Sequence, residues 1–240
     1  PLNTTLYDYD PNKFDISKAC MAYEVSTLGQ NQKVVKNRAQ VFCDYVGVKP
    51  STFLPNLYLS ESEQDWAQKF LRKFRKNILV ATSLRSAEAY RNWPLESYKK
   101  LFNIILRKNN KIKFLLLDQE RKWDFTSDNI IDGTGFVFRK SISLVNESQI
   151  VLTPDSGLLH VAGAFSKPTI ALFGPIDTEA RCNTYLKTLP VIDETLDCIP
   201  CWRNSQIPCR LNNSLNSSVC MENIKPERIA DLILEVVNHE

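Results

Sequence analysis

Residues 150–175, IVLTPDSGLLHVAGAFSKPTIALFGP, decide the fold class of this chain. The apolar run at 150–153 is typical of a buried strand, residues 156–165 suit a helix, and a second apolar run follows at 169–173. Two strands separated by a helix of about ten residues favour parallel pairing with a right-handed crossover. Continuous apolar strands are typical of sheets that helices cover on both faces. The stretch therefore predicts an α/β fold.

The same alternation continues on both sides of this stretch. Apolar runs predict further strands at 78–82, 113–117 and 136–138. Amphipathic spacing predicts further helices at 34–46, 61–75, 143–147, 226–237 and from Pro94 onward. We therefore expect a Rossmann-like parallel sheet over residues 77–238. Residues 1–76 are expected to form a partial or shortened N-terminal region that ends in a linker helix.

The composition is that of an ordinary globular protein. Of 240 residues, 43% are hydrophobic and 24% are charged, which excludes wholesale disorder. A net charge of +3 gives no broad basic surface, so we expect no nucleic-acid partner. No apolar run approaches the roughly 20 residues that span a bilayer, and no signal peptide is recognisable. We expect a protein without a transmembrane segment, either free in the cytoplasm or peripheral to the inner membrane.

The sharpest chemical signal is the turn Asp155-Ser156-Gly157 with His160 one helical turn later. It lies where a strand ends and a helix begins, and the unpaired N–H groups of a helix N-terminus favour anions such as a diphosphate. Ser156 and Gly157 let an anion approach the backbone, His160 can add a hydrogen bond, and Asp155 suits sugar hydroxyls. The alternative is that Asp155 only caps the helix and His160 is a satisfied core histidine.

A serine hydrolase is not expected. His160 is one of two histidines and lies four residues from Ser156 on the same predicted helix, and the G-x-S-x-G motif is absent.

A second polar loop follows the strand predicted at 78–82. Thr82 and Ser83 end that strand, and Arg91 precedes the helix that begins at Pro94. Two hydroxyls and a cation at a strand end suit phosphate, and Arg91 could neutralise a leaving diphosphate. The alternative is a solvated loop in which Trp93 packs as a hydrophobic staple.

Four cysteines gather near the C-terminus. They follow the pattern C-x2-C-x7-C-x10-C at Cys198, Cys201, Cys209 and Cys220. Four thiolates suit zinc or a single iron ion, and the surrounding segment, 196–222, has few residues that could form a core of its own. We therefore expect a four-cysteine metal knuckle inserted before the last helix. Two disulfides or free buried thiols are the alternatives.

Together these motifs resemble glycosyltransferase family 9, the lipopolysaccharide heptosyltransferases. Residues 153–175 are similar to that family's Asp-Thr/Ser-Gly-x-x-His turn and its strand ending Leu-Phe-Gly-Pro, and residues 81–94 are similar to its Ala-Thr-Thr to Lys-x-Trp-Pro segment. The resemblance places Thr82 and Ser83 on the phosphate-binding hydroxyls. Arg91 stands in place of the usual Lys, which keeps the charge and changes its shape.

The resemblance also places Glu120 on the acidic residue that holds the nucleotide ribose or base. Asp118-Gln119 replaces the Gly-Gly that usually precedes this residue. The cysteines have a counterpart in the branch of the family that modifies autotransporter adhesins, which carries a four-cysteine iron site. Iron is therefore a candidate beside zinc.

The resemblance implies a GT-B architecture, in which the second of two Rossmann-like domains binds the donor. It implies an inverting transfer of a heptose-like sugar from a nucleotide-sugar, ADP-heptose above all, to a glycan, a lipid-linked acceptor or a protein hydroxyl. It implies no catalytic metal. The general base belongs to the N-terminal domain of that family, so no catalytic residue is named here.

Two further expectations concern the chain as a whole. The first residue is not Met, and only about 76 residues precede the expected donor domain. We therefore expect either a fragment of a longer enzyme or a shortened protein. The rival hypothesis is a metal-stabilised binding or assembly module, a homo-oligomer for instance, that keeps the donor-domain fold without turnover.

Overall fold

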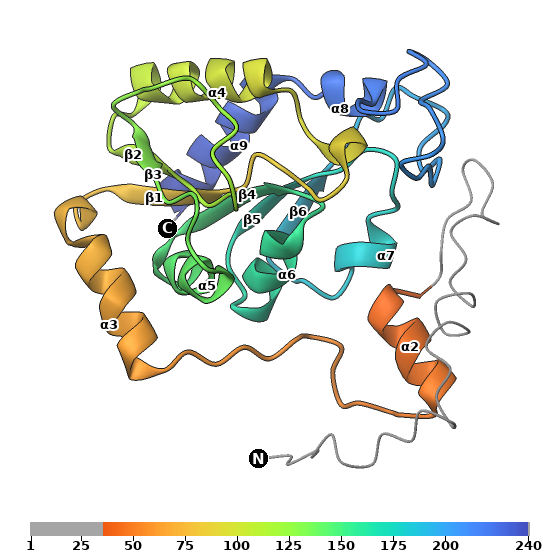
Figure 1. The fold of residues 1–240 in the computed structure, drawn as a ribbon, viewed down its shortest axis with the longest axis horizontal. Helices are drawn as coiled ribbons and strands as arrows, with labels where there is room; N and C mark the ends of the chain where they lie inside the picture. The colour runs from red at the N-terminus through yellow and green to blue at the C-terminus, as the bar shows by residue number, and fades with distance from the viewer. Residues whose placement is uncertain (1–35, 240) are drawn as a thin grey trace.

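A six-stranded parallel sheet organises residues 36–239, the part of the chain that the computed structural model describes (Figure 1). The strands are β1 (Ile78–Thr82), β2 (Ile112–Leu116), β3 (Ile130–Asp132), β4 (Ile150–Pro154), β5 (Thr169–Leu172) and β6 (Thr188–Val191). Their order across the sheet is β3-β2-β1-β4-β5-β6, and every neighbouring pair is parallel. The predicted parallel α/β sheet is confirmed.

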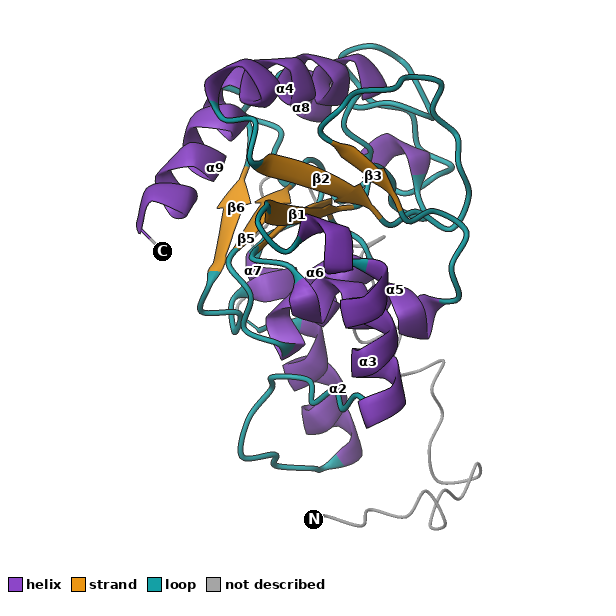
Figure 2. Cartoon of the chain, turned by 90° about the vertical axis from the view of Figure 1, so that its left-hand side faces the viewer, coloured by secondary structure: helices purple, strands orange, loops and turns teal. Residues whose placement is uncertain are grey.

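Helices cover both faces of this sheet. The helices of the described residues are α2 (Arg38–Val46), α3 (Glu61–Phe70), α4 (Leu95–Lys108), α5 (Phe138–Glu147), α6 (Gly157–Ala164), α7 (Glu179–Cys182), α8 (Val219–Glu222) and α9 (Pro226–His239), with short 3-10 turns η3 (Arg72–Phe74) and η4 (Ala89–Arg91). Helices α4 and α9 pack on one face, and α3, α5 and α6 pack on the other (Figures 1 and 2). Over residues 36–239, none of the helices combines the length and hydrophobicity that a membrane span requires.

The alternation of side chains along each strand divides the core into two layers. In β1, Val80 points toward the α4 and α9 layer, whereas Leu79 and Ala81 point toward the α3, α5 and α6 layer. All five residues of β4 are buried. Strands that are buried on both faces need apolar side chains at every position, which is why they read as continuous apolar runs in the sequence.

The sheet reverses its order between β1 and β4. From β1 the chain moves outward through β2 to β3, and it then returns to place β4 on the other side of β1. Loops that leave the carboxyl ends of these two strands therefore run in opposite directions and open a crevice between them. In open α/β sheets, ligands bind in that crevice.

The prediction of a strand at 136–138 is wrong. The third strand lies at Ile130–Asp132, and Phe138 opens α5. Phe136 instead packs edge-on against Trp66 and Phe70 of α3, with ring centroids 5.1 and 5.3 Å apart. An apolar run of three residues fits either a strand or a packing contact, and here helix α3 provides the contact.

Other elements extend or complete the expected pattern. Helix α2 confirms most of the helix predicted at 34–46, whose first two residues lie outside the described residues together with the rest of 1–35. Strand β6 was not predicted, because it has only four residues and two of them are exposed. Helix α3, which precedes the domain boundary expected at residue 77, packs on the same core layer as α5. The domain division itself stays a prediction.

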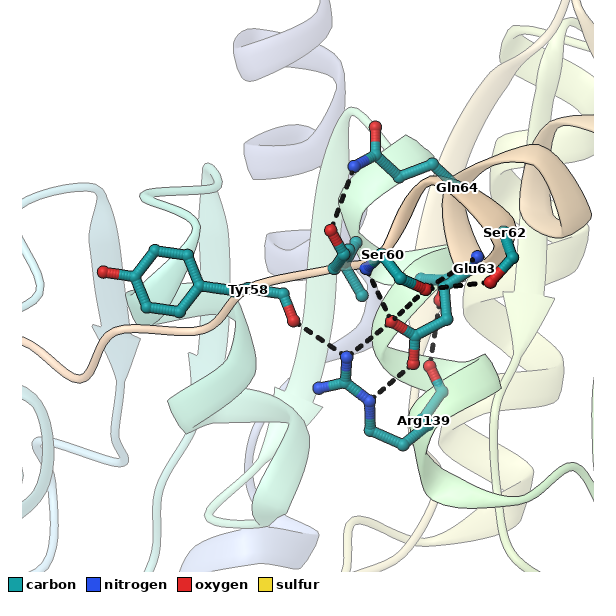
Figure 3. Close-up of polar contacts among 8 residues, drawn as sticks. Tyr58, Ser60, Ser62, Glu63, Gln64 and Arg139 are labelled. Atoms are coloured by element: carbon teal, nitrogen blue, oxygen red, sulfur yellow. Dashed lines mark hydrogen bonds and ion pairs between the residues drawn. The ribbon is translucent and has the colours of Figure 1, made fainter. Parts of the chain in front are cut away.

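Helix α3 begins at a capping box that also ties it to α5. The side chain of Ser60 accepts from the backbone N–H of Glu63, and the Glu63 carboxylate accepts from the backbone N–H of Ser60. Arg139 of α5 donates to both carboxylate oxygens of Glu63 at 2.6 Å and to the carbonyl oxygen of Tyr58 at 2.8 Å (Figure 3). A single glutamate therefore caps α3 and anchors it to the helix that lines the crevice.

The stability gained from Glu63 should depend on pH. The hydrogen bond from Arg139, with that from the backbone of Ser60, lowers the pKa of Glu63 from 4.5 to about 2. Because the pKa is lower in the folded state, the stabilisation is complete above about pH 5 and is lost as the pH falls toward 2. We expect the melting temperature of wild type to exceed that of Glu63→Gln at about pH 6, by a margin that shrinks between about pH 5 and pH 3. A margin that is constant over this range would contradict the ion pair.

Candidate functional site

A cavity of about 600 Å³ opens at the carboxyl ends of β1, β2 and β4. It is formed by the loop after β1, the loop after β2, the start of α5 and the start of α6. Its lining residues are Ser83, Arg85, Ser86, Ala87, Leu117, Asp118, Gln119, Glu120, Lys122, Phe136, Val137, Phe138, Ser141, Ser156, Gly157 and Leu158. The cavity thus occupies the crevice at the switch point, and its volume suits a nucleotide-sized molecule.

Asp118 fixes the loop that forms one wall of this cavity. It accepts hydrogen bonds from the backbone N–H of Leu84 at 3.1 and 3.2 Å, and its Oδ1 lies 2.9 Å from the hydroxyl oxygen of Ser83. That hydroxyl also lies 2.7 Å from the carbonyl oxygen of Arg85. Burial raises the pKa of Asp118, while these hydrogen bonds act to lower it. The carboxylate therefore orders the first residues after β1.

Asp118 was not among the predicted site residues. One signal in the sequence could have found it, because it is an acidic residue close after the second strand, where many dinucleotide-binding folds hold a ribose. Its partners here are backbone and hydroxyl groups of the β1 loop, so its role in this chain is to hold that loop.

The N-terminus of α6 forms the opposite wall. Ser156, and not Asp155, caps this helix, because the Ser156 hydroxyl accepts from the backbone N–H of Leu158 at 3.3 Å. The same hydroxyl lies 2.7 Å from Oγ1 of Thr153. Ser156 and Gly157 both line the cavity, and their predicted role in holding a diphosphate stays a prediction. The first N–H groups of α6 and the helix dipole give this wall an affinity for anions.

Asp155 lies between two arginines at the edge of the cavity. Its Oδ2 is 3.1 Å from Nη1 of Arg91 and 3.4 Å from Nε of Arg181, and its side chain is only 7% exposed. The structure thus brings the predicted residues Arg91 and Asp155 together from η4 and the β4–α6 turn. The guanidinium of Arg91 pairs with Asp155 here, and neither side chain is among the residues that line the cavity.

His160 belongs to a different cavity. Its Nδ1 lies 2.8 Å from the hydroxyl of Tyr185, in a hollow of about 280 Å³ that residues of α2 and α7 complete. Desolvation in this hollow lowers the pKa of His160, the positive charges of Arg181 and Arg38 lower it further, and Asp155 opposes them. The structure therefore separates His160 from Ser156 and Gly157, which share its helix.

The two remaining residues that are predicted to bind the nucleotide-sugar differ in burial. Thr82 is fully buried, and its hydroxyl donates to the carbonyl oxygen of Val80 in the same strand at 3.0 Å. Glu120 is exposed at the rim of the cavity, 2.8 Å from Nζ of Lys122. The hydrogen bond and charge of Lys122, with the more distant charge of Arg85, lower the pKa of Glu120. Glu120 can therefore contact a ligand in this cavity. The hydroxyl of Thr82 instead donates within its own strand and does not line the cavity.

The four cysteines line one cavity of about 370 Å³, and all four are free thiols, not disulfides. Across residues 36–239, however, no group of three or more His, Cys, Asp or Glu side chains is arranged to hold a metal ion. The predicted metal knuckle is therefore not seen as an assembled site. Burial raises the pKa of Cys201 and raises that of Cys220 to about 12.

The comparisons with known proteins agree on one family. The sequence model of glycosyltransferase family 9 (heptosyltransferase) matches residues 18–210. The lipopolysaccharide core heptosyltransferase OpsX of Haemophilus influenzae is 28% identical over 142 residues, which is 55% of this chain and 40% of OpsX.

Solved structures of the same family share the fold at low identity. Heptosyltransferase II of E. coli has a TM-score of 0.59 at 17% identity, with 81% of this chain and 57% of that one covered. A family 9 protein of Veillonella parvula has a TM-score of 0.64 at 17% identity, covering 89% and 63%. The iron-containing, dodecameric TibC of enterotoxigenic E. coli has a TM-score of 0.59 at 14% identity, covering 85% and 53%.

The chain spans less than two thirds of the length of each of these relatives. The family model nevertheless covers most of this chain, from residue 18 to residue 210. The chain therefore belongs to glycosyltransferase family 9, the heptosyltransferases.

Proposed function

We propose that this chain binds the donor of a glycosyltransferase that moves a heptose-like sugar from ADP-heptose to a glycan, lipopolysaccharide or protein hydroxyl. The observation that carries the proposal is the cavity at the switch point, which joins an anion-binding helix N-terminus to a nucleotide-sized volume in a family 9 fold. TibC, which shares the fold, has been crystallised with ADP-D-β-D-heptose, which supports ADP-heptose as the donor.

The cavity suits the three parts of such a donor. The nucleoside would lie against the loop that Asp118 holds, with Glu120 at the rim for ribose or base and Phe138 on the α5 side. The diphosphate would lie at Ser156 and Gly157. Arg91 does not line the cavity, and it would meet the diphosphate from the side of Asp155, with which it pairs. The heptose would then extend past Asp155, whose carboxylate oxygens can accept hydrogen bonds from sugar hydroxyls.

Transfer of the sugar depends chiefly on stabilising the leaving group. An acceptor hydroxyl attacks the anomeric carbon on the face opposite the diphosphate, the bond from that carbon to the β-phosphate oxygen breaks, and the configuration inverts. Negative charge grows on the departing ADP. The N–H groups at the start of α6 and the guanidinium of Arg91 stabilise that charge. The base that takes the proton of the acceptor hydroxyl is not one of these residues.

A calorimetric titration with ADP, UDP, GDP, CDP and ADP-heptose tests the proposal. We expect selective binding of ADP and tighter binding of ADP-heptose, with dissociation constants of about 1 μM to 1 mM. In Gly157→Leu both should be lost without a loss of fold, because a Cβ at Gly157 would meet only the Phe138 ring, at 3.5 Å. If folded wild type bound no nucleotide, the donor site would be refuted. Sugar transfer in the presence of an acceptor would exclude the rival non-catalytic module.

We further propose that Cys198, Cys201, Cys209 and Cys220 hold one structural iron or zinc ion. Besides their shared cavity, the hydrogen bonds to sulfur support this proposal. Burial acts to raise the pKa of Cys209, but the backbone N–H groups of Val219, Leu211 and Asn212 outweigh it and lower that pKa. Such bonds favour the thiolate that a metal binds. The ion would order an insertion that has little core of its own, and TibC is an iron-containing relative by fold.

Metal analysis of the purified protein checks this proposal. We expect about one iron or zinc ion per chain, because four thiolates complete one tetrahedral site. Strong chelation should speed hydrogen exchange in residues 196–222 before it affects the sheet. Protein that is fully folded and free of metal, with unchanged exchange in this segment, would contradict the metal site.

A further inference from the structure

Arg203 is the polar centre of the cysteine insertion, residues 196–222. The residue is 3% exposed, and its guanidinium donates to five neutral oxygens of the insertion itself. Nε donates to the carbonyl oxygen of Ile207 at 2.9 Å, Nη1 to Ser217 O at 2.8 Å and Ser218 Oγ at 3.1 Å, and Nη2 to Ser214 O at 2.9 Å and Leu215 O at 2.8 Å. Because one guanidinium binds five oxygens, it sets the shape of an otherwise irregular segment.

The insertion contacts the body of the domain at Tyr90 of η4. The guanidinium carbon of Arg203 lies 4.8 Å from the centre of the Tyr90 ring. The hydroxyl of Ser218, which also accepts from Arg203, donates to the carbonyl oxygen of Tyr90 at 2.7 Å. Tyr90 is 2% exposed, so both contacts are shielded from water. Arg203 and Ser218 therefore fix Tyr90 through both its ring and its backbone.

Tyr90 in turn holds the next residue, Arg91. Nη2 of Arg91 donates to the Tyr90 hydroxyl at 3.1 Å, and its guanidinium carbon lies 5.3 Å from the centre of the Tyr90 ring. Nη1 of the same guanidinium pairs with Asp155 at 3.1 Å. Tyr90 and Asp155 thus hold the Arg91 fork at two of its nitrogens.

From this chain of contacts we infer that Arg203 and Tyr90 are positioning residues, through which the cysteine insertion holds Arg91 in place for the donor diphosphate. The inference rests on the proposed function for the identity of the ligand, whereas the contacts among Arg203, Tyr90 and Arg91 are observed in the structure. A long, flexible side chain loses conformational entropy when it becomes ordered on binding an anion. An arginine that is already held in place loses less of this entropy, so the anion binds more tightly. The insertion would therefore raise donor affinity without touching the donor.

Three variants test the inference with ADP as the probe. Tyr90→Phe removes only the hydroxyl that accepts from Arg91 and keeps the ring that Arg203 covers. Arg203→Met removes the centre of the insertion. Arg210→Met makes the same chemical change at an exposed arginine of the insertion and serves as the matched control.

Arg203→Met should weaken ADP binding about tenfold, the size of one charged hydrogen bond, and should speed hydrogen exchange in residues 86–93. Tyr90→Phe should weaken ADP binding about threefold to tenfold, which a purely structural role would not produce, while the loss of one buried hydrogen bond lowers the melting temperature by only a few degrees. Arg210→Met should change neither quantity.

Two results would overturn the inference. One is faster exchange in Arg203→Met that stays within residues 196–222. The other is unchanged ADP affinity in both Arg203→Met and Tyr90→Phe. If wild type bound no ADP, the proposed function would fail, and the exchange of residues 86–93 in Arg203→Met would still decide whether the insertion holds this segment.

Discussion

Asp155→Ala is expected to reduce sugar transfer about 100- to 1000-fold while the protein stays folded. Asp155 is the only carboxylate that pairs with both Arg91 and Arg181 within residues 36–239, and it lies beside the α6 N-terminus. Its loss removes the group that we propose orients the sugar, and it removes the anion that Arg91 and Arg181 share. The reacting carbon is then misplaced relative to the leaving diphosphate, which alone can cost orders of magnitude in rate.

Nucleotide affinity separates this role from a general loss of structure. In Asp155→Ala, ADP should bind at least as well as in wild type, because the site becomes more positive toward phosphate. ADP-heptose should lose its advantage over ADP. Asp155→Asn should behave likewise, with less effect on stability because it keeps the side-chain volume. As a control, Asp193→Asn changes another buried aspartate and should leave transfer unchanged. Undiminished transfer by Asp155→Ala would refute the proposed site.

Trp93→Ala is expected to lower the free energy of unfolding by about 3–5 kcal/mol, the usual cost of deleting a buried aromatic ring. Trp93 is 1% exposed and packs edge-on against Tyr98, with ring centroids 4.7 Å apart. Its indole Nε1–H donates to the carbonyl oxygen of Ile224 at 3.0 Å. The side chain therefore joins the start of α4 to the segment between α8 and α9.

Denaturant unfolding followed by circular dichroism measures this loss. Trp93→Phe removes the hydrogen bond and part of the ring system but keeps an aromatic ring, so it should cost less, about 1–3 kcal/mol. Tyr58→Ala is the control, because the Tyr58 ring is 80% exposed and its removal should change stability by less than about 0.5 kcal/mol. A midpoint for Trp93→Ala that matched this control would show that Trp93 is not part of the core.

The sequence predicted those parts of the fold whose signals are local. Strand β4, helix α6 and strand β5 follow from one stretch because their periodicity is strong and their lengths are usual. A strand end that leads into a helix start is itself a local feature, and the cavity lies at such a point, whereas its role as the donor site stays a prediction. Strand β3 has only three residues, and two of the four residues of β6 are exposed, so neither forms the fully buried apolar run that marks β5.

The parts of the site that could not be predicted depend on contacts between distant residues. Asp118 meets Leu84 across 34 residues of sequence, and Ser218 meets Tyr90 across 128. Position along a helix also does not say which cavity a side chain meets. His160 follows Ser156 on α6, yet its partner Tyr185 lies beyond α7, and this contact takes the imidazole to the second cavity.

The most direct test of the central claim is to map where ADP binds by NMR. Titration of ADP into ¹⁵N-labelled protein should shift the amide signals of residues 83–87, 117–122, 136–141 and 156–158, which together surround the cavity at the switch point. Residues 198–220 of the cysteine insertion should shift less. Shifts confined to that insertion, or no shifts at millimolar ADP, would contradict a donor site at the carboxyl ends of β1, β2 and β4.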